Sequence, residues 1–108
     1  MEKEQKLKLD ATLEKVNLAA EKWVKANVIY QEKNREFEIS QIVEDENPLF
    51  LHMDLEEASN KLKAARIELE AVILKLETMA ITLEDSALAN KIAKLISEYR
   101  RLLNENKT

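Results

Sequence analysis

Hydrophobic residues recur at alternating steps of four and three along most of the chain. Over residues 6–44 no glycine or proline interrupts this spacing. A repeat of this kind places its members on one side of an α-helix, as in helices that pack lengthwise against each other. We therefore expect a long first helix over residues 6–44. Its stripe consists of Leu9, Leu13, Val16, Ala20, Trp23, Asn27, Tyr30, Asn34, Phe37 and Gln41.

Polar residues enter the second half of this stripe. Asn27, Asn34 and Gln41 occupy positions where an apolar residue is expected. Such residues cost stability, and they often fix the register or the oligomeric state of packed helices. The alternative is that Asn27 and Asn34 face water. A second apolar stripe runs beside the first and gives this helix more than one hydrophobic side, and it contains Val24, Val28, Ile29, Ile39, Ile42 and Val43.

An acidic segment that ends in Asn47 and Pro48 predicts the main turn. Asparagine caps helices, and proline suits the first helical position because its missing N–H would have no partner there. The second helix is therefore expected over residues 48–81. A second possible start is Asp54, with Glu57 as a reciprocal cap. In that case residues 49–53 form a loop that folds back onto the end of the bundle.

The second helix has the most regular stripe of the chain, and after it a third helix is expected over residues 84–104. Between Ala71 and Leu83 the apolar positions widen around the helix, which indicates contact with two neighbours. The residues from Thr82 to Asp85 have the composition of an N-terminal cap. The second stripe consists of Leu51, Leu55, Ala58, Leu62, Ala65, Leu69, Val72, Leu76, Met79 and Leu83. The third consists of Leu88, Ile92, Leu95, Tyr99 and Leu102, with Ile96 and Leu103 beside it.

Short turns make consecutive helices antiparallel, so the sequence predicts one all-α domain over residues 1–108. The expected fold is an antiparallel three-helix bundle, in other words a coiled-coil-like hairpin with a shorter third helix. At ~1.5 Å per residue the three helices would be about 60, 50 and 33 Å long. The third helix would then lie beside residues 64–79, where Leu69, Val72 and Leu76 enter the core. Residues 31–62 would remain as a two-helix arm.

Composition supports an α-helical, soluble protein. Hydrophobic residues make up 45% and charged residues 35% of the chain, with no glycine and one proline, which disfavours hairpins and phosphate-binding loops. No cysteine is present, and no apolar run is long enough to span a bilayer, so we expect a cytoplasmic protein without membrane contact. The richness in Lys, Glu, Asn and Ile is typical of AT-rich bacterial or phage genomes.

Charge disfavours nucleic acid as a partner. The net charge is −4, and the last segment, residues 84–108, has only five basic against four acidic residues. A nucleic-acid surface needs a concentrated basic face. The lysines and arginines of the last helix, Lys91, Lys94, Arg100 and Arg101, are expected to form a solvated face.

No group of residues in the sequence predicts catalysis or a cofactor. His52 is the only histidine, and with Glu56 it supplies at most two ligands of a metal site. The serines lack a nearby base or a glycine elbow. Trp23 lies on the first stripe and is expected in the core. We therefore expect no catalytic, cofactor-binding or metal-binding residues and no cofactor.

The expected function is protein–protein interaction through helix packing, in a homodimer that acts as a structural or adaptor protein. The third helix is too short to cover the far tip of the arm, which leaves apolar residues on several sides of two helices. The alternative is a monomeric inhibitor, immunity or secretion-partner protein that binds another protein through the same arm. The expected interface residues are Phe37, Ile39, Ile42, Val43, Leu49, Phe50, Leu51, Met53 and Leu55.

Overall fold

The protein is all-α. The computed structural model describes the backbone of residues 3–43 and 48–105, and the side-chain surroundings of residues 3–42 and 51–105. Helix α1 is Lys3–Val43, α2 is Pro48–Ile81 and α3 is Ser86–Glu105. These ranges contain 41, 34 and 20 residues, so the third helix is the shortest, as expected. No strand occurs in the described part of the chain.

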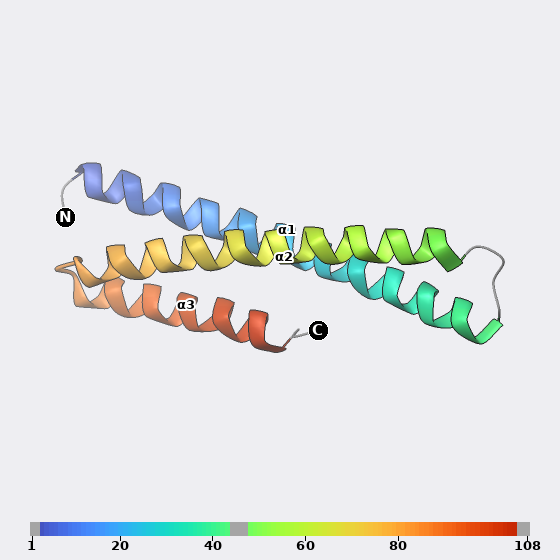
Figure 1. The fold of residues 1–108 in the computed structure, drawn as a ribbon. Coiled ribbons are helices and arrows are strands. Elements are labelled where there is room, and N and C mark those ends of the chain that lie inside the picture. Colours follow the sequence, from blue (N-terminus) through green and yellow to red (C-terminus); the bar gives the residue numbers. More distant parts are fainter. Residues whose placement is uncertain (1–2, 44–47, 106–108) are drawn as a thin grey trace.

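The three helices run up, down and up. In Figure 1, α1 and α2 lie lengthwise beside each other, and α3 turns back along α2 at one end of the hairpin. The molecule is 62 Å long and 21 Å wide. Two contacts align α3 with α2: Arg100 pairs with Glu77, and Arg66 donates a hydrogen bond to the carbonyl oxygen of Leu103. Because α3 ends beside Arg66, the rest of the hairpin forms a two-helix arm.

All three helices contribute to one hydrophobic core, and Trp23 is in it with 1% of its surface exposed. Leu69 and Leu76 are completely buried, while Val72 is half-buried against the same cluster. This confirms the expected core positions in the three-helix section. The buried apolar residues of the cluster are Leu9, Val16, Ala19, Ala20, Trp23, Leu62, Ala65, Leu69, Ile73, Leu76, Ile92, Ile96 and Leu103.

The first stripe ends one position earlier than its spacing predicted. Gln41 is exposed, and Ser40 is buried in its place. The Ser40 hydroxyl donates a hydrogen bond of 2.7 Å to the carbonyl oxygen of Phe37 in the preceding turn. Ser40 lies four heptads after the buried Thr12, and the heptad positions between them, Ala19, Ala26 and Lys33, are buried or half-buried, so the buried side of α1 near the tip follows this neighbouring stripe.

The second helix starts at Pro48, so the fold-back loop over residues 49–53 is wrong. Proline has the backbone geometry of a first helical residue, which suits a helix that begins at this position. Asp54 therefore lies inside α2, where its carboxylate is 3.9 Å from the Lys33 ammonium of α1. Asn47, the expected cap, lies outside the described residues.

The third helix starts two residues later than expected, because Asp85 is its cap. The Asp85 carboxylate accepts hydrogen bonds from the backbone N–H groups of Ala87 at 3.0 Å and Leu88 at 3.2 Å. Aspartate at this position satisfies N–H groups that have no partner within the helix. The Thr82 hydroxyl instead donates to the carbonyl oxygen of Met79 and so belongs to the end of α2.

Contact with α3 explains only some of the additional apolar residues near the C-terminal end of α2. Ile73 is buried and Ala80 is half-buried, as expected for contact with α3. Leu74 and Ile81, however, are exposed. These two residues lie on the outer side of α2, which neither α1 nor α3 covers.

Candidate interaction surface

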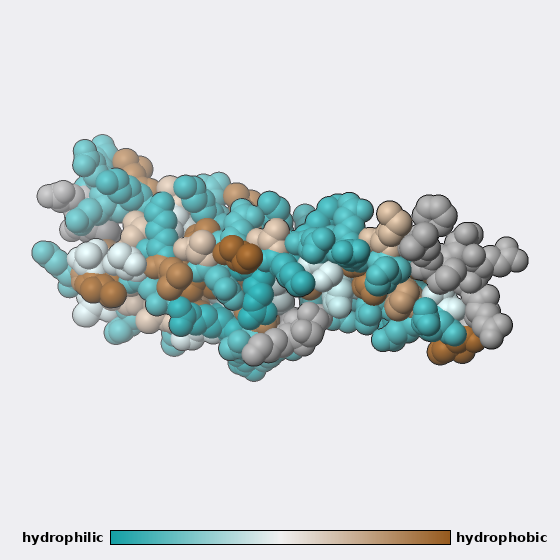
Figure 2. All heavy atoms as spheres, in the orientation of Figure 1, coloured by the Kyte–Doolittle hydropathy of each residue, from teal (hydrophilic) through white to brown (hydrophobic). Residues whose placement is uncertain are grey.

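The arm carries exposed apolar side chains where a two-helix hairpin has no third layer. Ile42 is 81% exposed, Met53 is 56% exposed and Ile39 is 51% exposed. In Figure 2, hydrophobic side chains are scattered over the hairpin, and one group lies at the C-terminal end of α1. A helix pair buries one stripe of each helix, so residues on the other sides remain in water.

The structure separates the expected interface residues into two groups. Phe37, Leu51 and Leu55 are half-buried between the helices, whereas Ile39, Ile42 and Met53 face outward. The Phe37 ring contacts the His52 ring at a centroid distance of 5.7 Å, which fixes the packing of α1 on α2 near the tip. The side chains of Val43, Leu49 and Phe50 lie outside the described set.

A second surface lies in the middle of the hairpin, and the sequence did not predict it. It is a groove of about 400 Å³ between α1 and α2. Small side chains open it, because alanines leave the two backbones without a covering layer. Ile29, which is 49% exposed, is the largest apolar residue in its wall. The groove is lined by Lys22, Lys25, Ala26, Ile29, Ala58, Lys61, Ala64, Ala65 and Glu68.

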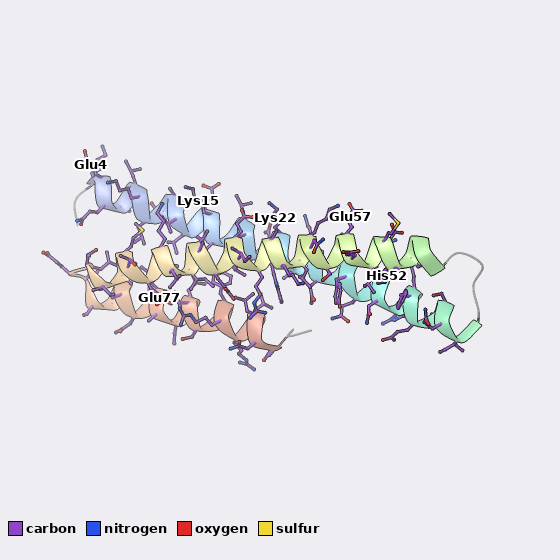
Figure 3. The ribbon with its side chains drawn as sticks, viewed as in Figure 1. Glu4, Lys15, Lys22, His52, Glu57 and Glu77 are labelled. Carbon is purple, nitrogen blue, oxygen red and sulfur yellow. The ribbon has the colours of Figure 1, made fainter. Side chains whose placement is uncertain are left out.

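Charged residues form the rim of this groove. The Lys22 ammonium is 3.2 Å from the Glu68 carboxylate across the two helices, and Lys61 is 3.1 Å from Glu57 on α2. In Figure 3, Lys22 and Glu57 project from the edge of the hairpin opposite α3. None of the groove residues comes from α3. This face is therefore an open side of the hairpin with apolar walls and a charged rim.

Only two titratable groups have a clearly shifted pKa among the described residues, and both belong to α3. Burial raises the pKa of the Tyr99 phenol, and the nearby carboxylates of Glu98 and Glu21 raise it further. A hydrogen bond and the charge of Glu105 raise the pKa of the exposed Arg101 guanidinium. Glu21 lies on α1, and Tyr99 packs against the core to which all three helices contribute. Neither shifted group lies in the arm or in the groove.

His52 and Glu56, the two possible metal ligands considered above, do not belong to a larger cluster of such residues in the described part of the chain. His52 and Glu56 are both exposed on α2. In residues 3–43 and 48–105, no group of three or more His, Cys, Asp or Glu side chains is placed to hold a metal ion. Within the same described ranges, no helix combines the length and the apolar character needed to cross a bilayer.

Comparison of the chain with family models, with curated proteins and with solved structures finds no match.

Proposed function

We propose that this protein is a non-enzymatic interaction module that packs an open face of its helical hairpin against another protein. The observation that supports this proposal most directly is Ile42, a large apolar side chain that is 81% exposed at the end of α1. Ile39 and Met53 extend the exposed apolar surface of the arm. Exposed apolar surface at the end of a hairpin that has no further layer to cover it is a candidate site of protein contact. A cytoplasmic location, which fits a chain without cysteine, is part of the proposal.

The partner in the first form of this proposal is a second copy of the chain. Two arms that pair side by side would form a four-helix section and cover the apolar residues of both copies. Such a contact is isologous, so it closes after two subunits and produces no fibre. The protein would then serve as a homodimeric structural or adaptor protein.

The alternative is a monomer that inhibits or escorts a different protein, and one observation favours it. Residues 31–61 contain nine acidic and three basic side chains. Two arms that pair side by side would bring like charges together, whereas a basic partner would find opposite charge there. Immunity proteins, inhibitors and secretion partners fit this second form.

Oligomeric mass together with an exposed substitution tests both forms. We expect a dimer by light scattering in the micromolar range, and Ile42→Asp should convert it to a monomer if the tip is the contact. Because Ile42 lies outside the core, circular dichroism should show unchanged helix content. Ser97→Asp, on the exposed surface of α3, is the matched control. A wild-type monomer at high micromolar concentration would move the inhibitor or adaptor form to first place.

A further inference from the structure

Charged residues along one stripe of α1 change sign at its middle. Lys22 and Lys25 precede Ile29, and Glu32 and Glu36 follow it, at steps of three, four, three and four. This spacing places all five on one side of the helix. Lys22, Lys25 and Ile29 line the open groove between α1 and α2. The stripe thus has a basic half, an apolar centre and an acidic half.

Apolar residues lie at both ends of the same stripe. Leu18 precedes Lys22 by four positions, and Ile39 follows Glu36 by three. Both are large side chains with more than half of their surface exposed, Leu18 at 57% and Ile39 at 51%. In the reverse direction, from Ile39 to Leu18, the stripe has the same order of apolar and charged positions, but each charge has the opposite sign.

We propose that a second copy of this chain packs antiparallel on this face, with a two-fold axis passing beside Ile29. The two Ile29 side chains then meet at the axis, Lys25 of each copy faces Glu32 of the other, and Lys22 faces Glu36. Leu18 of each copy packs on the Ile39 side chain of the other. This assignment rests on the proposed interaction function and moves the contact from the tip of the arm to the middle of the hairpin.

The positions of charged residues on α2 are also compatible with this two-fold axis. Lys22 pairs with Glu68 and Lys33 approaches Asp54, so Ile29 of α1 lies between these levels, near Lys61 of α2. Glu57 and Lys61 lie one turn apart on α2 at the level of the axis. The two-fold symmetry therefore places Glu57 of each copy opposite Lys61 of the other. The alanines of the groove, Ala26, Ala58 and Ala64 among them, allow the second copy to approach closely.

The arrangement also avoids the repulsion between two acidic arms that pair with each other. In an antiparallel dimer centred on Ile29, the acidic arm of each copy lies beside the three-helix end of the other. Residues 1–30 contain six basic and five acidic side chains, and residues 62–108 contain eight and seven, so that end is weakly basic. The molecule is 62 Å long and 21 Å by 14 Å across, so a lengthwise face has room for the roughly 800 Å² per partner that stable interfaces bury.

Reversal of one charge pair tests the contact. No ion pair within the described residues involves Lys25 or Glu32, so Lys25→Glu and Glu32→Lys leave the intramolecular ion pairs intact. Each substitution alone should weaken self-association by about tenfold in sedimentation experiments at low salt, because like charges then face each other twice per dimer. An equimolar mixture of the two variants should recover the wild-type affinity, since both contacts become unlike again.

Lys91→Glu is the matched control, because it reverses an exposed charge on α3 and should leave the dimer unchanged. Circular dichroism of every variant checks that the helices persist. A dimer that resists both single reversals but dissociates with Ile42→Asp overturns this interface and retains the tip contact of the proposed function. A mixture that associates no better than the single variants overturns the antiparallel pairing. A wild type that is monomeric at high micromolar concentration overturns both self-association proposals.

Discussion

The Arg66 guanidinium of α2 donates a hydrogen bond of 3.5 Å to the backbone carbonyl oxygen of Leu103 in the last turns of α3. Carbonyl groups at a helix C-terminus lack partners within the helix and carry partial negative charge. Arg66 also binds Glu70 on its own helix, at 2.9 Å, which orients the guanidinium. This contact lies where the three-helix section of the molecule gives way to the arm.

Removal of this side chain should loosen the end of α3. Arg66→Ala is expected to lower the free energy of unfolding by about 1 kcal/mol, the usual contribution of one hydrogen bond with a charged donor near a helix terminus. Urea denaturation measures the change. Glu70→Gln, which removes only the pairing within α2, should cost less. Equal losses for the two variants would mean that the contact with Leu103 contributes nothing.

Burial in the three-helix section predicts a large difference between two leucines on the same helix. Leu69 is completely buried, whereas Leu74 is 58% exposed. Leu69→Ala should lower the free energy of unfolding by ~2–5 kcal/mol, because the truncated side chain leaves a cavity among all three helices. Leu74→Ala should change it by less than about 0.5 kcal/mol. A loss below about 1 kcal/mol for Leu69→Ala would contradict the packing of α3 at this position.

Most of the fold could be predicted from the sequence, because one spacing rule extends over long segments without glycine. The stripe around Trp23 is buried as expected, and the proline at residue 48 marks the start of α2. The errors lie at helix ends and at the end of a long stripe. Ser40 is buried instead of Gln41 because the packing of α1 on α2 decides which of two neighbouring stripes is covered near the tip. Asp85 caps α3 instead of Thr82 because a cap depends on which side chain reaches the free N–H groups.

The interaction surfaces were less predictable. The apolar surplus of the arm was visible in the sequence, and Ile39, Ile42 and Met53 are exposed as expected. The sequence placed Phe37 and Leu51 both on the packing stripes and among the expected interface residues, and the register of α1 on α2 decides between the two: both are half-buried. The groove was missed for the same reason: it is a feature of two helices, and residues far apart in the chain form it.

The raised pKa of Tyr99 gives a test of the distance between α1 and α3. Burial is its main cause, and the carboxylates of Glu98 and Glu21 add to it. In a Tyr30→Phe background, phenolate absorbance reports Tyr99 alone. Glu21→Gln should lower the pKa of Tyr99, because it removes a negative charge on α1 that opposes ionisation. Glu14→Gln is the control on the same helix, and an equal shift there would contradict a specific approach of Glu21.

The same raised pKa makes stability depend on pH in the alkaline range. The folded state favours the neutral phenol of Tyr99, so this group contributes stability at pH values below the ordinary pKa of a tyrosine, about 10. The contribution is lost as the pH rises through the pKa of the folded state. Tyr99→Phe should therefore reduce the alkaline loss of unfolding free energy, measured by denaturation at increasing pH.

Asn27 combines burial with an unsatisfied polar atom. It is only 8% exposed, so the alternative that it faces water is wrong. Among the residues that the structure describes, its amide oxygen has no hydrogen-bond partner, and the same holds for the indole nitrogen of Trp23 one turn earlier. An amide oxygen that loses water without gaining a donor destabilises the folded state, by about 1–3 kcal/mol. Asn34, at the next heptad position, is only half-buried and donates to Glu38 at 3.4 Å.

Asn27→Leu should therefore raise the free energy of unfolding by about 1 kcal/mol, because leucine has the same branched arrangement of side-chain heavy atoms and leaves no unsatisfied oxygen. Thermal and urea denaturation measure the gain, and Asn34→Leu should have a smaller effect. Light scattering of the same variant tests the other role of a polar residue on a helix stripe, the control of register and oligomeric state. If the variant is more stable but its oligomeric mass changes, the role of Asn27 is to control the oligomeric state. A less stable variant of unchanged mass would contradict the argument, since it would mean that the amide gains more from its surroundings than its burial costs.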